Sequence, residues 1–541
     1  MRKGTVRHAT YSRVRFIDKY ACGAYRLAHL IANHAHAPVA LVQLTSTAER
    51  AQAMSAAQYD VVIVGSGFAG LGMAVRLKQD GIDNFIILEQ DQDFGGTWWA
   101  NSYPGCAVDV PSHLYSFSFA QNAGWTRRFA RQEELLAYTR AVVRDFGLES
   151  HIRLNTTFDG ALFDEGGGFW HVHTSAGPVR ARCVVSATGA LNRPALPALP
   201  GLQDFAGTTF HSSRWDHRYD LRGKRVAVIG TGASAIQFVP EIAPEVARLD
   251  VYQRTPPWIL PRPDRAITAP EKWLLKKSRA VQWLYRALVY VQYESRALWY
   301  VHAPKVLRVA AWQARRHMHA QVADPELRKK LTPYYAIGCK RVLLMNTYYP
   351  ALTRPNVALI TDPVARVTAH SIISASGEER EVDAIVFGTG FDVEHAASAV
   401  DVVGRAGKRL FADQREAYKG CAVAGFPNYF MITGPNTGLG HNSMIYMIES
   451  GVAYVLGAIR DVLDLDLHSV EVRADVQAAY NADLRRRMQG TVWSSGCKSW
   501  YLDKDGNNFT LWPGFTFTYR RLTRRFDIEN YVVTERRQTE N

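Results

Sequence analysis

Residues 59–90 of this 541-residue chain read YDVVIVGSGFAGLGMAVRLKQDGIDNFIILEQ. The stretch predicts an apolar strand, a glycine-rich turn, a helix and a second strand that ends in an acid, which together make a complete βαβ unit. In such a unit the glycines allow a tight turn and a close approach of the backbone to a pyrophosphate, and the helix N-terminus faces the phosphates. A dinucleotide-binding site is therefore expected here.

The glycine turn and the acid supply the first candidate binding residues. Those of the turn are Gly65, Gly67, Phe68, Ala69 and Gly70. Glu89 follows Gly65 by 24 residues, at the end of the second strand, where a carboxylate accepts hydrogen bonds from a ribose 2′-hydroxyl. The alternative interpretation is a helix turn that needs glycine for packing alone.

A second unit of the same order begins at Lys224 and reads KRVAVIGTGASAIQFVPEIAPEVARLDVYQRT. Its candidate binding residues are Gly230, Thr231, Gly232, Ala233, Ser234, Arg254 and Thr255. Arg254 stands where the first unit has an acid, and a guanidinium pairs with a ribose 2′-phosphate that a carboxylate would repel. This unit is expected to prefer NADPH, with a plain surface role of Arg254 as the alternative. Two different dinucleotides in one chain indicate hydride transfer from NADPH to a flavin.

The order of elements predicts an α/β fold with two Rossmann-like dinucleotide-binding domains, for FAD and NADPH, and a helical insertion. Short apolar strands end at small-residue turns, one of which contains Thr188, and the proline-rich residues 191–202 suggest a crossover between domains. The expected domains are an FAD-binding domain of residues 54–190 and 390–541 and an NADPH-binding domain of residues 191–389, which includes a glycine-free helical insertion at 262–332. Residues 1–53 form a basic N-terminal extension, either a transit-like segment or a stretch without a role in the fold that precedes a true start at Met54.

Composition excludes several classes of protein. The net charge is +14, of which +6 falls in residues 1–53 and +8 in residues 271–320, so the remainder is neutral, unlike a general nucleic-acid binder. No apolar run reaches the roughly 18 residues of a membrane span. The six cysteines are scattered without a C-x-x-C motif, which excludes zinc-ribbon spacing and favours separate thiols in the cytoplasm. No metal site is expected.

Two longer motifs carry a family resemblance. Residues 205–216 read FAGTTFHSSRWD, and residues 95–109 read GGTWWANSYPGCAVD. Both resemble signatures of the type I Baeyer-Villiger monooxygenases, within the flavin-containing monooxygenase superfamily. The first motif contributes Phe205, Gly207, His211, Trp215 and Asp216, which lie at the domain connection in that family. The second contributes the cofactor-binding candidates Gly96, Thr97, Trp98, Tyr103 and Asp109.

The resemblance also implies catalytic and nucleotide-binding residues. Residues 335–341, YAIGCKR, are similar to a family stretch whose arginine lies over the flavin, which makes Arg341 the catalytic candidate and Asp109 its carboxylate partner. Lys340 is a second candidate for the 2′-phosphate, and Trp500 resembles a tryptophan that contacts the nicotinamide nucleotide. The alternatives are an unrelated structural pair for Arg341 and Asp109, a solvated lysine and a core tryptophan.

The implied activity is insertion of one oxygen of O2 next to a ketone carbonyl through a C4a-peroxyflavin, which gives an ester or lactone. A permanent cation suits this chemistry, because the attacking peroxide must stay anionic. The partners are a small-molecule ketone and O2, without nucleic acid, and the oligomeric state is open. The alternatives are oxygenation of sulfur or nitrogen, a pyridine-nucleotide disulfide oxidoreductase, which the missing dithiol motif disfavours, and a flavoprotein that only binds a partner.

Residues 271–320 combine eight tryptophans and tyrosines with ten basic residues. Helices with aromatic and basic residues can lie on membranes. The alternative is a lobe whose aromatic residues pack on the nucleotide domain while its basic residues face water. Both interpretations stay open from sequence.

Overall fold

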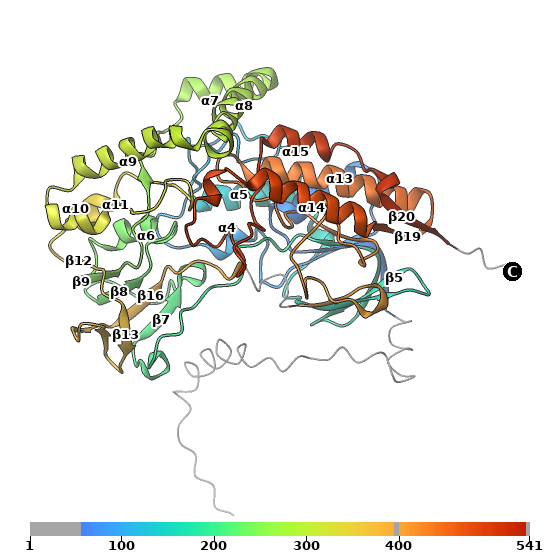
Figure 1. Cartoon of the computed structure of the whole chain (residues 1–541). Helices are drawn as coiled ribbons and strands as arrows, with labels where there is room; N and C mark the ends of the chain where they lie inside the picture. Colours follow the sequence, from blue (N-terminus) through green and yellow to red (C-terminus); the bar gives the residue numbers. More distant parts are fainter. Residues whose placement is uncertain (1–55, 394–399, 537–541) are drawn as a thin grey trace, which may run out of the picture. The chain divides into compact units, whose positions relative to one another are not determined.

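The computed structural model describes residues 56–393 and 400–536, and many of its helices and strands are labelled in Figure 1. Residues 55–541 cluster into one compact unit. The predicted α/β fold with two Rossmann-like sheets and inserted helices is confirmed. The predicted N-terminal extension, residues 1–53, lies outside the described residues.

The first sheet has eight strands in the order β17-β4-β5-β6-β1-β2-β3, with β18 paired to β6. Its strands are β1 (Ala57–Val64), β2 (Phe85–Leu88), β3 (Ile152–Arg153), β4 (Phe158–Asp164), β5 (Phe169–Thr174), β6 (Val179–Ser186), β17 (Asp401–Val403) and β18 (Tyr429–Met431). Its centre is parallel, since β1 pairs in parallel with both β2 and β6. Two short strands from the C-terminal part of the chain, β17 and β18, thus join a sheet that the N-terminal part begins.

The second sheet contains five strands, all parallel, in the order β12-β9-β8-β16-β7. They are β7 (Thr208–His211), β8 (Arg225–Ile229), β9 (Arg248–Tyr252), β12 (Val357–Ile360) and β16 (Ala384–Phe387). A three-stranded antiparallel sheet accompanies it, made of β13 (Val364–Val367), β14 (Ser371–Ser374) and β15 (Glu379–Glu381). The buried strands are short and rich in valine and isoleucine, as expected where helices cover a parallel sheet.

Each sheet begins its nucleotide-binding unit with a strand, a glycine turn and a helix. The helices are α3 (Phe68–Gln79) after β1 and α6 (Ala235–Ile242) after β8. Helix α3 packs against the long helix α13 (Met444–Asp464), which again brings C-terminal residues to the first sheet. The remaining described α-helices outside the insertion are α4 (Thr97–Ala100), α5 (Gln132–Asp145), α11 (Tyr348–Leu352), α14 (Ala474–Met488) and α15 (Thr516–Leu522), of which α11 packs against α6. The strands β19 (Leu467–Val472) and β20 (Tyr531–Glu535) form an antiparallel pair.

Helices occupy most of the stretch in which the sequence predicts an insertion. They are α7 (Ala269–Lys277), α8 (Arg279–Glu294), the π-helical turn η4 (Leu298–His302), α9 (Leu307–Gln321) and α10 (Pro325–Leu331). The strands β10 (Ile259–Leu260) and β11 (Leu343–Leu344), on either side of these helices, pair in parallel with each other. The chain therefore leaves and re-enters at one place, as an insertion does. In the described part of the chain, no helix is long and apolar enough to cross a membrane.

Candidate active site and cofactor-binding sites

The first glycine turn closes tightly on its own backbone. Gly65 has a φ of +100°, and a Cβ at Gly70 would lie 1.9 Å from the carbonyl oxygen of Gly65. Gly67 differs, because a Cβ there would meet only the Cα of Gly96, at 3.7 Å. The two motifs predicted separately, around Gly67 and Gly96, therefore meet in the structure. Thr188 also belongs here, since its Cα would lie 3.3 Å from a Cβ on Gly65.

Glu89 lies buried at the end of β2, beside the glycine turn. Its Oε2 accepts hydrogen bonds from the backbone nitrogen of Ser66, at 3.0 Å, and from the Ser66 hydroxyl, at 2.5 Å. Its Oε1 accepts one from the backbone nitrogen of Asp91. The carboxylate is thus held against the first turn by Ser66, a residue that the sequence analysis did not single out.

The second motif continues from Gly96 into helix α4, where Thr97 is the first residue and Trp98 is buried. The Trp98 indole nitrogen donates a hydrogen bond to the Tyr115 hydroxyl. Tyr103 is buried, which raises the pKa of its hydroxyl, and this hydroxyl donates to Oε1 of Gln237 over 2.9 Å.

Gln237 is a connection that the sequence analysis missed. It lies on helix α6 of the second sheet, yet its amide also exchanges hydrogen bonds with the backbone of Ala107. Gln237 therefore fixes the loop of Tyr103 to the other nucleotide-binding unit. An isolated glutamine on an apolar helix gives no sequence signal for such a role.

Asp109 and Arg341 form an ion pair. The Nε and Nη2 atoms of Arg341 both donate to Oδ2 of Asp109, over 2.9 and 2.5 Å. The negative charge of Asp109 raises the pKa of Arg341 above its usual value, so the guanidinium stays charged. No described residue accepts a hydrogen bond from Nη1 of Arg341, and the side chain remains 37% exposed. A cation with a fixed orientation and a free donor therefore stands at this position.

The second glycine turn repeats the geometry of the first. Gly230 has a φ of +105°, and a Cβ there would lie 2.5 Å from the carbonyl oxygen of Gly388. The Thr231 hydroxyl donates to the carbonyl of Thr255. Gly232 and Ala233 are exposed, and Ser234 is the residue before helix α6.

A cavity of about 700 Å³ lies beside this turn. Its lining residues are Arg254, Thr255, Tyr334, Tyr335, Ala336, Lys340, Ser495, Gly496, Cys497 and Lys498. The structure thus brings Arg254, Thr255 and Lys340 together. Burial, with the Arg254 charge as a smaller contribution, lowers the pKa of Lys340. The three basic side chains of the cavity, those of Arg254, Lys340 and Lys498, favour an anionic ligand.

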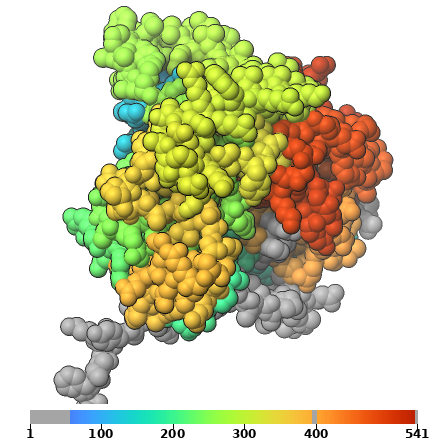
Figure 2. Space-filling model, turned by 60° about the vertical axis from the view of Figure 1, so that its left-hand side comes forward, coloured from blue at the N-terminus to red at the C-terminus, as the bar shows by residue number. Residues whose placement is uncertain are grey.

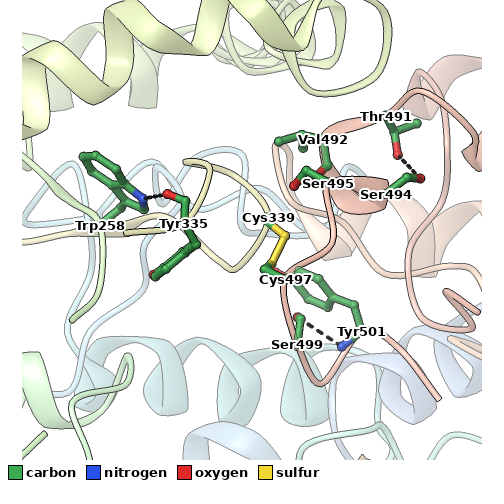
Figure 3. The surroundings of a disulfide bond; sticks show 10 residues. All are labelled: Trp258, Tyr335, Cys339, Thr491, Val492, Ser494, Ser495, Cys497, Ser499 and Tyr501. Atoms are coloured by element: carbon green, nitrogen blue, oxygen red, sulfur yellow. Dashed lines mark hydrogen bonds between the residues drawn. A yellow bond between two sulfur atoms is a disulfide. The ribbon is translucent and has the colours of Figure 1, made fainter. Parts of the chain in front are cut away.

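The predicted thiol state of two cysteines is wrong. Cys339 and Cys497 form a disulfide with a Cα–Cα distance of 6.3 Å (Figure 3), although 158 residues separate them in sequence. Such a separation leaves no spacing pattern to recognise. Cys106, Cys183 and Cys421 are free and buried. The disulfide joins the two sides of the cavity, because Cys339 precedes Lys340 and Cys497 belongs to the opposite loop.

Trp500 does not line this cavity. Its side chain is 44% exposed, and its ring contacts Tyr501, which is buried. It is therefore no core tryptophan in this structure.

The fingerprint residues lie just before, on and just after the edge strand β7. A Cβ at Gly207 would lie 2.5 Å from the carbonyl oxygen of Asp383, so this position requires glycine, and the Phe205 ring lies beside it. His211 is buried, its Nδ1 accepts a hydrogen bond from the Ser213 backbone, and burial lowers its pKa to about 4. The Trp215 ring packs between Phe210 and Phe238. Asp216 accepts hydrogen bonds from the backbone and side chain of Arg218.

Comparison with known proteins decides the family. A Baeyer-Villiger monooxygenase of Pseudomonas aeruginosa is 53% identical over 480 residues, which are 88% of this chain and 91% of that protein. One of Streptomyces coelicolor is 48% identical over 478 residues, 87% of this chain and 92% of that protein. The chain belongs to the Baeyer-Villiger monooxygenase family. The resemblance seen in the two sequence motifs is confirmed.

Solved structures of such monooxygenases share the fold. An oxidized steroid monooxygenase bound to NADP superposes with a TM-score of 0.79 at 30% identity, over 89% of this chain and all of that one. A closed cyclohexanone monooxygenase gives a TM-score of 0.80 at 27% identity, with the same coverage. A family model described as pyridine nucleotide-disulphide oxidoreductase matches residues 62–274, which contain nearly all of the first nucleotide-binding unit and all of the second. This Baeyer-Villiger monooxygenase is an NADPH-dependent flavoprotein with FAD.

The two glycine turns fit these cofactors. At Gly67 and at Gly232 a Cβ would meet nothing closer than 3.7 and 3.6 Å, while Gly65 and Gly230 are in close backbone contact. In each turn the first glycine is packed against backbone, while the second glycine has free space beside it. This arrangement allows a diphosphate to approach the backbone closely. The cavity beside the second turn is lined by three basic side chains, those of Arg254, Lys340 and Lys498.

Proposed function

We propose that Arg341 is the catalytic cation of this monooxygenase and that Asp109 orients it. The observation that carries the proposal is the ion pair, in which Nε and Nη2 hold Asp109 while Nη1 finds no protein acceptor among the described residues. Nη1 is thus available to stabilise negative charge on the reacting oxygen and then on the former carbonyl oxygen. Removing one such stabiliser typically costs about 100- to 1,000-fold in rate.

The substrate is a small-molecule ketone and the product an ester or a lactone. Bound FAD, reduced by NADPH, supplies the activated oxygen of O2. The chain binds FAD through Gly65, Gly67, Gly70 and Glu89, positions it with the loop from Gly96 to Asp109, and balances the charge of Arg341. The buried side chains of Trp98 and Tyr103 anchor this loop in the protein.

NADPH binds at the second turn with its 2′-phosphate in the cationic cavity. Arg254 and Lys340 pair with the phosphate, and Thr255 lies on the same wall. A guanidinium and an ammonium together favour the dianionic phosphate of NADPH over the hydroxyl of NADH. Trp500, in the exposed loop that follows Cys497, would contact the nicotinamide nucleotide.

The proposed domains follow the two sheets. Residues 54–190 and 390–541 form the FAD-binding domain, and residues 191–389 the NADPH-binding domain with its helical insertion at 262–332. We place the enzyme in the cytoplasm, where NADPH is supplied.

The test is stopped-flow spectroscopy of the purified holoenzyme and of Arg341→Ala. Each protein is reduced anaerobically with NADPH and then mixed with O2 and a ketone, while flavin spectra and products are recorded. Flavin reduction is expected in both, but ester formation only in the wild type. Equal ester formation in the variant would overturn the assignment of Arg341, and sulfoxides or hydroxylamines without ester would indicate heteroatom oxygenation.

A further inference from the structure

The helices α7 to α9 divide their aromatic residues by type. All four tryptophans of the stretch are exposed, by 61% at Trp273, 66% at Trp283, 42% at Trp299 and 60% at Trp312. The four tyrosines of this stretch, Tyr285, Tyr290, Tyr293 and Tyr300, are buried or half-buried. Figure 2 shows the green to yellow-green residues of this stretch at the top of the face in view. The expectation that the aromatic residues pack inward therefore holds for the tyrosines and fails for the tryptophans.

One side of helix α8 is fixed to the protein by polar contacts. Arg286 is buried and donates to the carbonyl oxygens of His113 and Ser116, both at 2.7 Å. One helical turn further on, the Tyr290 hydroxyl bonds to that of Thr516, and Glu294 accepts hydrogen bonds from the backbone and hydroxyl of Thr516. Arg286, Tyr290 and Glu294 thus face the protein.

The opposite side of α8 is apolar and exposed. Leu284, Leu288 and Val291 recur at helical spacing on this side and are 53%, 62% and 62% exposed. Trp283, near the start of the helix, is 66% exposed, and Leu298 follows in η4 at 46%. A surface helix normally turns such residues to the core and its charges to water. Here the arrangement is reversed, so this side of the helix is suited to an apolar environment.

The charges around this face are almost all positive. Lys276, Lys277 and Arg279 are exposed where α7 meets α8, and α9 exposes Arg308, Arg315 and Arg316. Residues 271–320 contain only two acids. Glu271 is paired with Arg265, and Glu294 is buried against Thr516. The exposed bases of the stretch therefore meet no unpaired acid within it.

We propose that the outer face of α7, α8 and η4, which we call the tryptophan face, docks on a bilayer that contains anionic phospholipid. Tryptophan concentrates at membrane interfaces, and lysine and arginine side chains are attracted to an anionic lipid surface. A second copy of the chain is a poorer partner, because pairing two such faces would bring like charges together. The contact is peripheral, and it is independent of the proposed catalytic residues.

Vesicle flotation of the full-length holoenzyme tests this proposal. The probes are phosphatidylcholine vesicles with and without about 30% phosphatidylglycerol, at low and high salt. The enzyme is expected to float with anionic vesicles at low salt, and to do so less at high salt or without phosphatidylglycerol. Absence of flotation with anionic vesicles at low salt would overturn the proposal.

Two triple variants locate the contact. W283S/L288S/V291S removes the apolar side, and K276Q/K277Q/R279Q removes the charges. Each is expected to weaken vesicle binding by at least about tenfold, because buried apolar area and surface charge both contribute. The matched control is L465S/V532S, which changes residues that are 62% and 51% exposed on other elements.

All variants must keep the flavin content and NADPH oxidation rate of the wild type, which shows that they fold. Wild-type binding by both triple variants would place the contact elsewhere, for example in residues 1–53, and overturn the proposal. Concentration-dependent dimers that only W283S/L288S/V291S abolishes, without vesicle binding by the wild type, would assign the face to a second copy instead.

Discussion

Two nitrogens of Arg341, Nε and Nη2, donate hydrogen bonds to the same carboxylate oxygen of Asp109, although Arg341 and Asp109 are 232 residues apart in sequence. Asp109 is the last residue of the motif at residues 95–109, which contacts the first glycine turn through Gly96 and Gly67. Arg341 follows the helical insertion of the second unit. The pair therefore depends on the packing of two nucleotide-binding units against each other. Gln237 strengthens the same junction, since it binds both Tyr103 and the Ala107 backbone.

Substitution at Asp109 is expected to lower the rate of ester formation without abolishing it. In Asp109→Ala the guanidinium keeps its charge but loses its orientation, so kcat is expected to fall by about 10- to 100-fold, less than the loss expected on removing the cation itself. Asp109→Asn keeps an acceptor oxygen and should lie between the wild type and Asp109→Ala. Steady-state product analysis measures both, and equal activity of all three proteins would show that the pair is only structural.

Loss of Arg254 is expected to remove the preference for NADPH. A charge-assisted hydrogen bond contributes about 1.5–3 kcal/mol, so Arg254→Ala should raise the KM for NADPH by about 10- to 100-fold. Lys340→Ala should act in the same direction. The KM for NADH is the internal control and should not change. A parallel rise in both KM values would instead indicate a distorted domain.

Two neighbouring glycines are expected to fail in different ways. Gly70→Ala places a Cβ 1.9 Å from the Gly65 carbonyl oxygen, so the turn cannot form and little folded protein is expected. Gly67→Ala has room within the protein and should fold, but its methyl group points to the proposed pyrophosphate site. Its affinity for FAD is expected to fall by at least about tenfold. Titration of the apoprotein with FAD measures this, and unchanged affinity in Gly67→Ala would contradict the proposed site.

Opening the Cys339–Cys497 disulfide is expected to weaken NADPH binding. The loop of Ser495 to Lys498 would lose its covalent link to the Lys340 wall and would have to be ordered on binding, which raises KM by about two- to tenfold. Dithiothreitol should produce this change in the wild type and none in C339S/C497S. An effect of dithiothreitol on C339S/C497S would assign the change to another thiol.

His211 is expected to make the protein less stable in mild acid. Burial lowers its pKa to about 4, below the usual value near 6.5, so the unfolded chain binds the proton more readily. The contribution of neutral His211 to the free energy of unfolding is complete above about pH 6.5 and is lost as the pH falls towards 4. From pH 7.5 to pH 5 this residue alone contributes about 2 kcal/mol to the loss.

Guanidinium denaturation at the two pH values checks this contribution. His211→Gln should reduce the difference in stability between pH 7.5 and pH 5. His370→Gln, at an exposed position, should leave that difference unchanged. A pH dependence that is identical in all three proteins would exclude His211 as its source.

The sequence predicted the parts of this molecule that depend on local spacing. Each nucleotide-binding unit spans 32 residues, which contain its strands, its helix, its glycine turn and the acid or base that follows. The fold class follows from these local patterns. The meeting of Gly67 with Gly96 and the bonds of Gln237 depend on tertiary packing, which no local pattern records. The Cys339–Cys497 disulfide was missed because it joins distant loops. The orientation of the tryptophans of α7 to α9 stayed open from sequence, because their exposure departs from the rule that apolar residues are buried.

The insertion of one nucleotide-binding unit between the two halves of the other has a consequence for biosynthesis. Strands β17 and β18 and helix α13 leave the ribosome after every strand of the second sheet has been made. Domains generally fold as units during translation. The nascent chain must therefore hold β6 and α3 without their C-terminal partners for the time needed to translate more than 200 residues. During that interval chaperones, or early capture of the flavin, would protect the incomplete sheet from aggregation.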